Sequence, residues 1–189
     1  MSQFLEKIIQ RAQENKKTIV LPESTDIRTI KAAAMVLEKG FANIVLVGEE
    51  DKINELKGDL NIDGATIVDP LKSDKIDDYV NTLYELRKHK GMTIDQAREA
   101  MKNPLFWGVM MVKKGEADGM VAGAINSTAN TLRPALQILK TAPGTKLVSS
   151  FFIMIIPDCE FGSKGTFVFS DCGLVENPSA DDLSEIALA

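Results

Sequence analysis

Residues 18–48 read TIVLPESTDIRTIKAAAMVLEKGFANIVLVG, with two short apolar runs on either side of a longer amphipathic segment. The runs at 18–21 and 43–47 have the length of buried strands. Between them, apolar residues recur at spacings of three and four from Ile27 to Leu37, which predicts a helix, and Gly40 stands where such a helix would end. A strand, a helix and a second strand in this order predict a βαβ unit with parallel strands.

The alternation of strand and helix patterns continues to residue 123. Two more strands are predicted at 65–68 and 119–123. Further helices are predicted at 50–56, between the second and third strands, and at 76–90, 94–102 and 105–114, between the third and fourth. This order predicts the α/β fold class, with a mostly parallel sheet and helices on both of its faces.

The pattern changes after residue 140. Two strands, predicted at 147–156 and 166–169, follow each other without a helix between them, which indicates an antiparallel hairpin. A helix then begins near Ser179, where Asp182 three residues later resembles a capping box. We place a domain boundary at Gly144, between a first domain at 1–143 and the start of a second at 144–189. Because the last helix has no C-cap, we expect the sequence to be a fragment that ends inside it.

Composition excludes several classes of protein. Lys and Arg number 22 against 27 Asp and Glu, a net charge of −5, which argues against a nucleic-acid partner. The single histidine, His89, and the two cysteines, Cys159 and Cys172, are too few for the usual metal sites or a disulfide framework. The most apolar stretch, 148–157, is too short to span a membrane. With an amphipathic N-terminus in place of a signal peptide, the expected location is the cytoplasm.

The segment 123–134, GAINSTANTLRP, is the strongest candidate site. It follows a buried strand and precedes a helix, which is where ligands bind in open α/β sheets. Asn126, Ser127 and Thr128 offer small polar groups, free N–H groups at a helix start attract anions, and Arg133 adds a planar cation suited to phosphate or carboxylate. Pro134 disfavours helix at the preceding residue, so the helix is predicted to begin there, leaving 123–133 extended. The alternative interpretation is a polar loop with a helix cap.

Two further segments carry weaker signals. The run Arg87-Lys-His-Lys90 is either a solvated charged face at a helix C-terminus or a cationic wall for an anionic substrate. The run Ser170-Asp-Cys-Gly173, with Asn177 after it, follows a strand. Asp171 there is either a base or hydroxyl ligand, or the organiser of a tight turn together with Asn177. Cys172 has no histidine near it in sequence to act as its base, so a nucleophilic role is disfavoured.

Four stretches resemble the phosphate acetyltransferase (phosphotransacetylase) family: IVLPESTDIRTIKAA, YELRKHKGMT, ADGMVAGAINSTANTLRPALQILKTAPG and FSDCGLVENPSADDLSEIA. The resemblance implies a three-layer α/β/α fold like that of the isocitrate and isopropylmalate dehydrogenases. It also implies a first domain completed by the C-terminal end of a longer chain, a second inserted domain, an active site in the cleft between them, and a homodimer. The implied reaction is acetyl-CoA plus phosphate giving acetyl phosphate plus coenzyme A, with no metal or other cofactor.

The resemblance also implies roles for individual residues. Arg87 and Arg133 match the arginines that contact phosphate and coenzyme A, which overturns the surface interpretation of Arg87. The loop with Asn126, Ser127 and Thr128 matches the one lining the acetyl phosphate site. Asp171 and Asn177 match a motif at the edge of the cleft, as further substrate-binding candidates.

The implied mechanism is direct transfer, in which the coenzyme A thiol loses its proton to a carboxylate and attacks the acetyl carbonyl while arginines hold the leaving phosphate. Family members extend beyond the equivalent of Ala189, and the general base is expected in that portion. If this chain were the whole polypeptide, we would expect no transferase activity and exposed apolar surface. The alternatives are a phosphate butyryltransferase, or a non-catalytic module that binds acetyl-CoA or phosphate, like the related domains fused behind malic enzymes.

Overall fold

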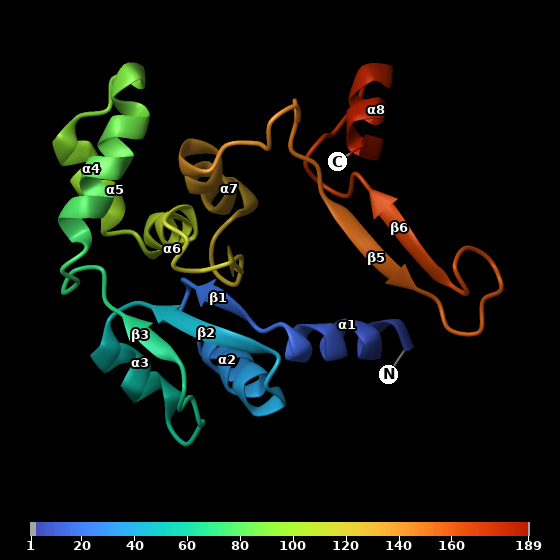
Figure 1. Cartoon of the computed structure of the whole chain (residues 1–189), viewed down its shortest axis with the longest axis horizontal. Coiled ribbons are helices and arrows are strands. Elements are labelled where there is room, and N and C mark those ends of the chain that lie inside the picture. Colours follow the sequence, from blue (N-terminus) through green and yellow to red (C-terminus); the bar gives the residue numbers. More distant parts are fainter. Residues whose placement is uncertain (1–2, 189) are drawn as a thin grey trace. The chain divides into compact units, whose positions relative to one another are not determined.

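The computed structural model describes residues 3–188 (Figure 1). The described residues divide into two compact units: Lys7–Lys140 form one, and residues 3–6 and 141–188 belong to the other. The boundary between domains predicted from the sequence lies at Gly144. Helix α1 (Gln3–Glu14) begins in the second unit and ends in the first.

The larger unit, Lys7–Lys140, alternates strands and helices as predicted. Its strands are β1 (Lys17–Leu21), β2 (Ala42–Val47), β3 (Thr66–Val68) and β4 (Gly119–Met120). Its further helices are α2 (Ile27–Lys39), α3 (Glu50–Lys57), α4 (Ile76–Arg87), α5 (Ile94–Met101), α6 (Pro104–Lys113) and α7 (Thr128–Ile138), with a 3-10 turn at Lys88–Lys90 after α4.

The four strands form one parallel sheet in the order β3-β2-β1-β4 (Figure 1). Strand β1 lies at its centre and pairs with β2 over its whole length and with β4 through Ile19 and Val20. This confirms the α/β class and the parallel strands predicted from sequence. Strand β4 is shorter than the predicted range 119–123: the Val121 N–H still donates to the Val20 carbonyl oxygen at 2.9 Å, but the Gly123 N–H donates to the Glu23 carboxylate.

Helices cover both faces of the sheet, which gives the three layers. Alternate strand residues point to opposite faces, so the two faces carry different apolar sets. On one face, helices α4 to α7 pack over three valines of β1 and β2: Val20, Val45 and Val47. On the other face, α2 and α3 pack over Leu21, Ile44 and Leu46.

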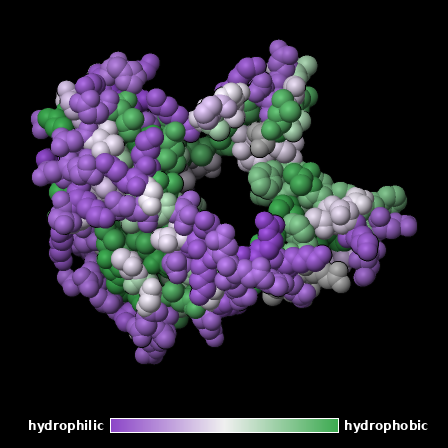
Figure 2. Space-filling model, in the orientation of Figure 1, coloured by the Kyte–Doolittle hydropathy of each residue, from purple (hydrophilic) through white to green (hydrophobic). Residues whose placement is uncertain are grey.

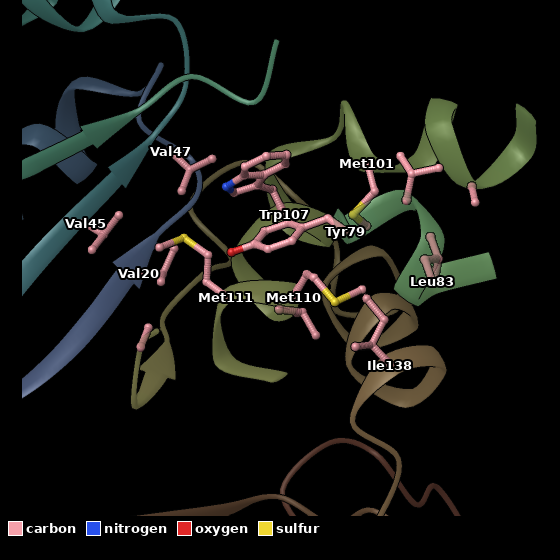
Figure 3. Packing of buried hydrophobic residues seen from close by; sticks show 14 residues of the cluster. Val20, Val45, Val47, Tyr79, Leu83, Met101, Trp107, Met110, Met111 and Ile138 are labelled. Carbon is pink, nitrogen blue, oxygen red and sulfur yellow. The ribbon is translucent and has the colours of Figure 1, made fainter. Parts of the chain in front are cut away.

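Trp107 of α6 lies fully buried in the larger of these two cores (Figure 3). Its ring centroid is 4.5 Å from that of Tyr79 on α4, at an interplanar angle of 44°. The Tyr79 hydroxyl donates a hydrogen bond of 2.8 Å to a carboxylate oxygen of Glu116. Met110 and Met111 are buried in the same core.

The smaller unit contains the predicted hairpin. Strands β5 (Phe151–Ile155) and β6 (Thr166–Ser170) pair antiparallel, with Phe151 opposite Ser170. Helix α8 (Ala180–Leu188) follows, and its start is the predicted capping box: the Ser179 hydroxyl accepts from the Asp182 N–H at 3.2 Å, while the Ser179 N–H donates to the Asp182 carboxylate at 2.9 Å.

Apolar side chains of the hairpin are exposed, and Figure 2 shows hydrophobic residues at the surface of this segment. On the two strands the exposed set comprises Phe151, Phe152, Ile153, Met154, Val168 and Phe169. A two-stranded hairpin is at best marginally stable on its own in water. Among residues 3–188, no helix has both the length and the apolar character needed to cross a bilayer.

Candidate functional site

The candidate site is the loop between β4 and α7, where the sequence placed Asn126, Ser127 and Thr128. Because β1 and β4 are adjacent and parallel, the segments that leave their carboxyl ends lie side by side. The segment after β1 begins with Pro22, Glu23 and Ser24. The site is therefore built from two loops a hundred residues apart in sequence.

The Glu23 carboxylate holds the loop after β4. One of its oxygens accepts from the N–H groups of Gly123 at 2.7 Å and Ala124 at 2.6 Å. The other accepts from the N–H groups of Ile125 at 3.0 Å and Asn126 at 2.8 Å, and from the Asn126 side-chain amide at 2.9 Å. Consecutive N–H groups that converge in this way form an anion-binding concavity. In this structure the anion is part of the chain itself.

Burial would raise the pKa of Glu23, whose residue is only 4% exposed. The hydrogen bonds from the Asn126 side chain and from the N–H groups of Asn126, Ile125 and Ala124 outweigh burial and lower the pKa from 4.5 to about 2. The carboxylate is therefore charged at neutral pH and is a weak base. A group with a depressed folded-state pKa stabilises the fold above its unfolded pKa and loses that contribution as the pH falls through the folded value.

We therefore expect Glu23 to stabilise the larger unit above about pH 4.5 and to lose this contribution between pH 4.5 and 2. The direct measurement is the pKa of the Glu23 carboxyl carbon by NMR titration. In addition, the Glu23→Gln variant should show a shallower decline of unfolding free energy over this range than the unchanged chain. A Glu23 pKa at or above 4.5 would contradict the hydrogen-bonded geometry.

Arg28 adds a second tie between the same two loops. Its guanidinium donates to the Ala124 carbonyl oxygen at 2.5 Å and to the carboxylate of Asp26, at 2.7 and 3.0 Å. Asp26 in turn caps α2 by accepting from the Arg28 N–H. The loop after β4 thus has its N–H groups bound by Glu23 and one carbonyl bound by Arg28.

Helix α7 begins earlier than predicted. The expected start at Pro134 is wrong: the helix covers Thr128–Ile138, and Pro134 is buried inside it. Ser127 is the N-cap, and its hydroxyl accepts from the Asn130 N–H at 3.3 Å. The cap and the turn that follows outweigh the cost of one missing N–H and of the restricted residue before proline. Residues 123–133 are therefore not one extended loop, because Arg133 lies on a helix.

The two arginines predicted as site residues both belong to the larger unit. Arg133 is exposed on α7, and Arg87 is half-buried in the last turn of α4. Helices α4 and α7 contact each other. Within residues 3–188, no hydrogen bond or ion pair joins either guanidinium to another side chain or to the backbone. Neither cation is neutralised by these residues, so both remain able to bind an anionic ligand.

Asp171 belongs to the smaller unit, and its carboxylate organises a turn. It accepts from the Ser150 hydroxyl at 2.6 Å and from the N–H groups of Gly173, Leu174 and Val175 at 2.8 to 3.1 Å. The Ser150 bond, followed by these N–H groups, holds the pKa of Asp171 well below its usual range. This is the turn-forming role that the sequence left open as the alternative.

Two other predicted residues lie near this turn. Asn177 is exposed. The Cys172 thiol donates to the Phe169 carbonyl oxygen at 3.0 Å. Among the residues that the structure describes, no group of three or more His, Cys, Asp or Glu side chains is arranged to hold a metal ion.

Sequence reasoning missed Glu23. The available signal was its place in PEST at 22–25, directly after β1 and so at the same sheet edge as the loop after β4. The sequence pattern did not reveal that β1 and β4 would be neighbours, because the pairing of these two strands depends on the order of the whole sheet.

Comparisons with known proteins agree on one family. The sequence model of the phosphate acetyl/butaryl transferase family matches residues 3–189. The chain is 69% identical over 186 residues to the phosphate acetyltransferase of Acetivibrio thermocellus, which covers 98% of this chain and 56% of that protein. It is 53% identical over 185 residues to the phosphate acetyltransferase of Thermoanaerobacterium thermosaccharolyticum, again covering 98% of this chain and 56% of the relative.

Solved structures give the same result. A phosphotransacetylase from Streptococcus pyogenes matches with a TM-score of 0.89 and 34% identity, over 100% of this chain and 57% of that one. A phosphotransacetylase from Staphylococcus aureus matches with a TM-score of 0.86 and 34% identity, over 97% of this chain and 54% of that one. The chain therefore spans a little more than half the length of these relatives.

Proposed function

The chain belongs to the phosphate acetyl/butaryl transferase family, and on this premise we propose that it takes part in acetyl transfer between phosphate and coenzyme A. The observation that carries the proposal is the identity of 69% to a phosphate acetyltransferase over nearly the whole chain. The proposed substrates are acetyl-CoA and phosphate in one direction, and acetyl phosphate and coenzyme A in the other.

We propose that Arg133 and Arg87 bind the phosphate groups of these substrates. Both guanidinium groups lack a partner within residues 3–188, and a planar guanidinium is suited to bidentate phosphate binding. Ser127 and Thr128, at the start of α7, are the proposed contacts to acetyl phosphate. Asp171 and Asn177 remain proposed contacts at the edge of the cleft.

In the proposed reaction, the coenzyme A thiol loses its proton to a carboxylate, and the thiolate attacks the acetyl carbonyl. The bond from the acetyl carbon to the phosphate oxygen breaks, and phosphate leaves toward the arginines. Fixed charges that stabilise such a transition state supply much of the rate of many enzymes. The chemistry proposed here needs no metal or other cofactor.

The proposed general base lies in the part of the family's length that this chain does not span. Two carboxylates of this chain, Glu23 and Asp171, are unsuited to the role of base. Both already accept several hydrogen bonds, which lower the pKa of each. A carboxylate so stabilised is a poor proton acceptor.

The decisive experiment compares this chain with a fusion in which residues 1–189 replace the matching half of the Acetivibrio thermocellus enzyme. The assay follows thioester absorbance from acetyl phosphate and coenzyme A. We expect turnover by the fusion and none by the 189-residue chain. A folded but inactive fusion would refute the proposed function, whereas turnover by the chain alone would refute the assignment of the base.

The same assay decides between acyl groups, because the family description covers both acetyl and butyryl transfer. We propose acetyl phosphate as the preferred substrate, on the basis of the relatives' names. A higher kcat/KM with butyryl phosphate would favour the alternative. Tight binding of acetyl-CoA without turnover by the fusion would favour a non-catalytic module.

We further propose a cytoplasmic homodimer with a first domain at 1–143 and the start of a second at 144–189, and with no nucleic-acid partner. The acidic net charge of −5 supports the last point. The family resemblance supports the dimer and the domains. Light scattering on the fusion tests the oligomeric state, and insensitivity of turnover to a chelator tests the absence of a metal.

A further inference from the structure

The four N–H groups of Gly123 to Asn126 point at one carboxylate, and converging N–H groups of this kind form an anion-binding concavity. Glu23 fills that position from within the chain. These N–H groups are therefore not available to a substrate while the loop has this conformation.

The conformation that Glu23 stabilises sets the direction of α7. Gly123 has a φ of 113°, a value that residues with a side chain rarely adopt. Ser127 follows in an extended conformation, with φ −67° and ψ 159°, and caps the helix. Arg133 lies five residues after the first helical residue, about one and a half turns into α7. A shift of the clamped loop therefore moves both the Ser127–Thr128 turn and the Arg133 guanidinium.

We propose that Glu23 is a positioning residue for acyl transfer: its carboxylate fixes residues 123–126, so that Ser127, Thr128 and Arg133 are already oriented before substrate binds. The proposal rests on the proposed function of the loop as the acetyl phosphate site. Glu23 does not itself contact the reacting atoms in this assignment, because its two oxygens are occupied by five N–H donors and the residue is 4% exposed.

The energetic benefit of the Glu23 contacts depends on when the loop becomes ordered. A flexible loop would have to be ordered by the substrate, and this cost would weaken binding of both the ground state and the transition state. Ordering by Glu23 occurs on folding, so the catalytic groups are held in place beforehand. Misplacement by about 1 Å can lower a rate by about a hundredfold.

The test uses Glu23→Gln in the fusion protein, with Glu38→Gln as its matched control. The glutamine keeps the size of the side chain, but it removes the charge and directs an NH2 group at N–H donors. Glu38 is an exposed carboxylate on α2. We expect kcat/KM for acetyl phosphate to fall about ten- to a hundredfold in Glu23→Gln, with a raised KM, and to remain unchanged in Glu38→Gln.

Hydrogen exchange distinguishes failure of this inference from failure of the proposed function, because it can be measured on the 189-residue chain without any turnover. We expect the amides of Gly123 to Asn126 to lose protection in Glu23→Gln, while the amides of β1 and β2 keep theirs. Unchanged protection of residues 123–126 would overturn the inference whatever the fusion does. Lost protection with an unchanged KM and kcat would also overturn it, because Glu23 would then be structural only.

The conservative variant Glu23→Asp supplies a final check. Its carboxylate is one methylene shorter, so it reaches fewer of the N–H groups, and we expect both KM and amide protection to lie between those of the parent chain and Glu23→Gln. Assays are run well below the thermal midpoint of each variant, because a lower amount of folded protein reduces kcat without changing KM. A loss in activity that tracks only the folded fraction would contradict a positioning role.

Discussion

Replacing Arg133 with alanine in the fusion protein is expected to lower kcat/KM for acetyl transfer by about 10²- to 10³-fold, the range seen when one transition-state donor is removed from other enzymes. The reason is that the guanidinium is proposed to hold the leaving phosphate, where charge develops as the bond breaks. The same variant should change the free energy of unfolding by less than about 0.5 kcal/mol, because Arg133 is exposed and has no partner within residues 3–188.

The matched control is Arg98→Ala. Arg98 is also a helical arginine of the larger unit, but it forms a surface ion pair of 2.7 Å with Asp77. Exposed ion pairs contribute little, so we expect this variant to retain both activity and stability. Arg133→Lys should recover only part of the activity, because lysine keeps the charge and loses the planar pair of donors. Full activity in Arg133→Ala would remove this residue from the proposed site.

The helix that carries Arg133 illustrates where local sequence rules reach their limit. The rule that proline disfavours helix at the preceding residue is correct as a preference, and it led to the wrong start at Pro134. In the structure, Ser127 supplies the cap, and Pro134 is buried within the larger unit. Tertiary packing and a good cap act together, and they exceed the local penalty at one residue.

The sheet was predictable for a simpler reason. A parallel strand between two helix layers is apolar on both faces. Runs such as 18–21 and 43–47 can therefore be recognised as strands from their own residues. The same holds for capping: Ser179 with Asp182 can be recognised from four consecutive residues. These features need no information about distant parts of the chain.

Recognising Glu23 as part of the site requires information about distant parts of the chain. The partners of its carboxylate are a hundred residues away, and its neighbours in sequence give no sign of burial. Arg87 is a further case, because a basic run at a helix end is normally solvated, and only the family resemblance assigns it a role. Its contact with phosphate stays a prediction. Local patterns thus indicated the loop after β4 as a candidate site. The fold was needed to find Glu23, the residue whose carboxylate binds the N–H groups of that loop.

Replacing Trp107 with alanine should destabilise the larger unit by about 3 to 5 kcal/mol, the range for buried large aromatic residues. Trp107 is fully buried in the core formed by α4 to α7 and the sheet, with its ring beside that of Tyr79 (Figure 3), so its removal leaves a cavity there. Chemical denaturation measures the loss. The control Leu71→Ala, which removes a side chain from a residue that is 64% exposed, should cost less than about 0.5 kcal/mol.

The variant Trp107→Phe removes the indole N–H but keeps an aromatic ring in the core. The Trp107 Nε1–H is buried, and no acceptor for it lies among residues 3–188. An unsatisfied buried donor costs about 1 to 3 kcal/mol, and phenylalanine removes that cost while keeping a ring beside Tyr79. We therefore expect Trp107→Phe to lose less than half of what Trp107→Ala loses. Equal losses would mean that a phenyl ring recovers none of the packing that the indole provides.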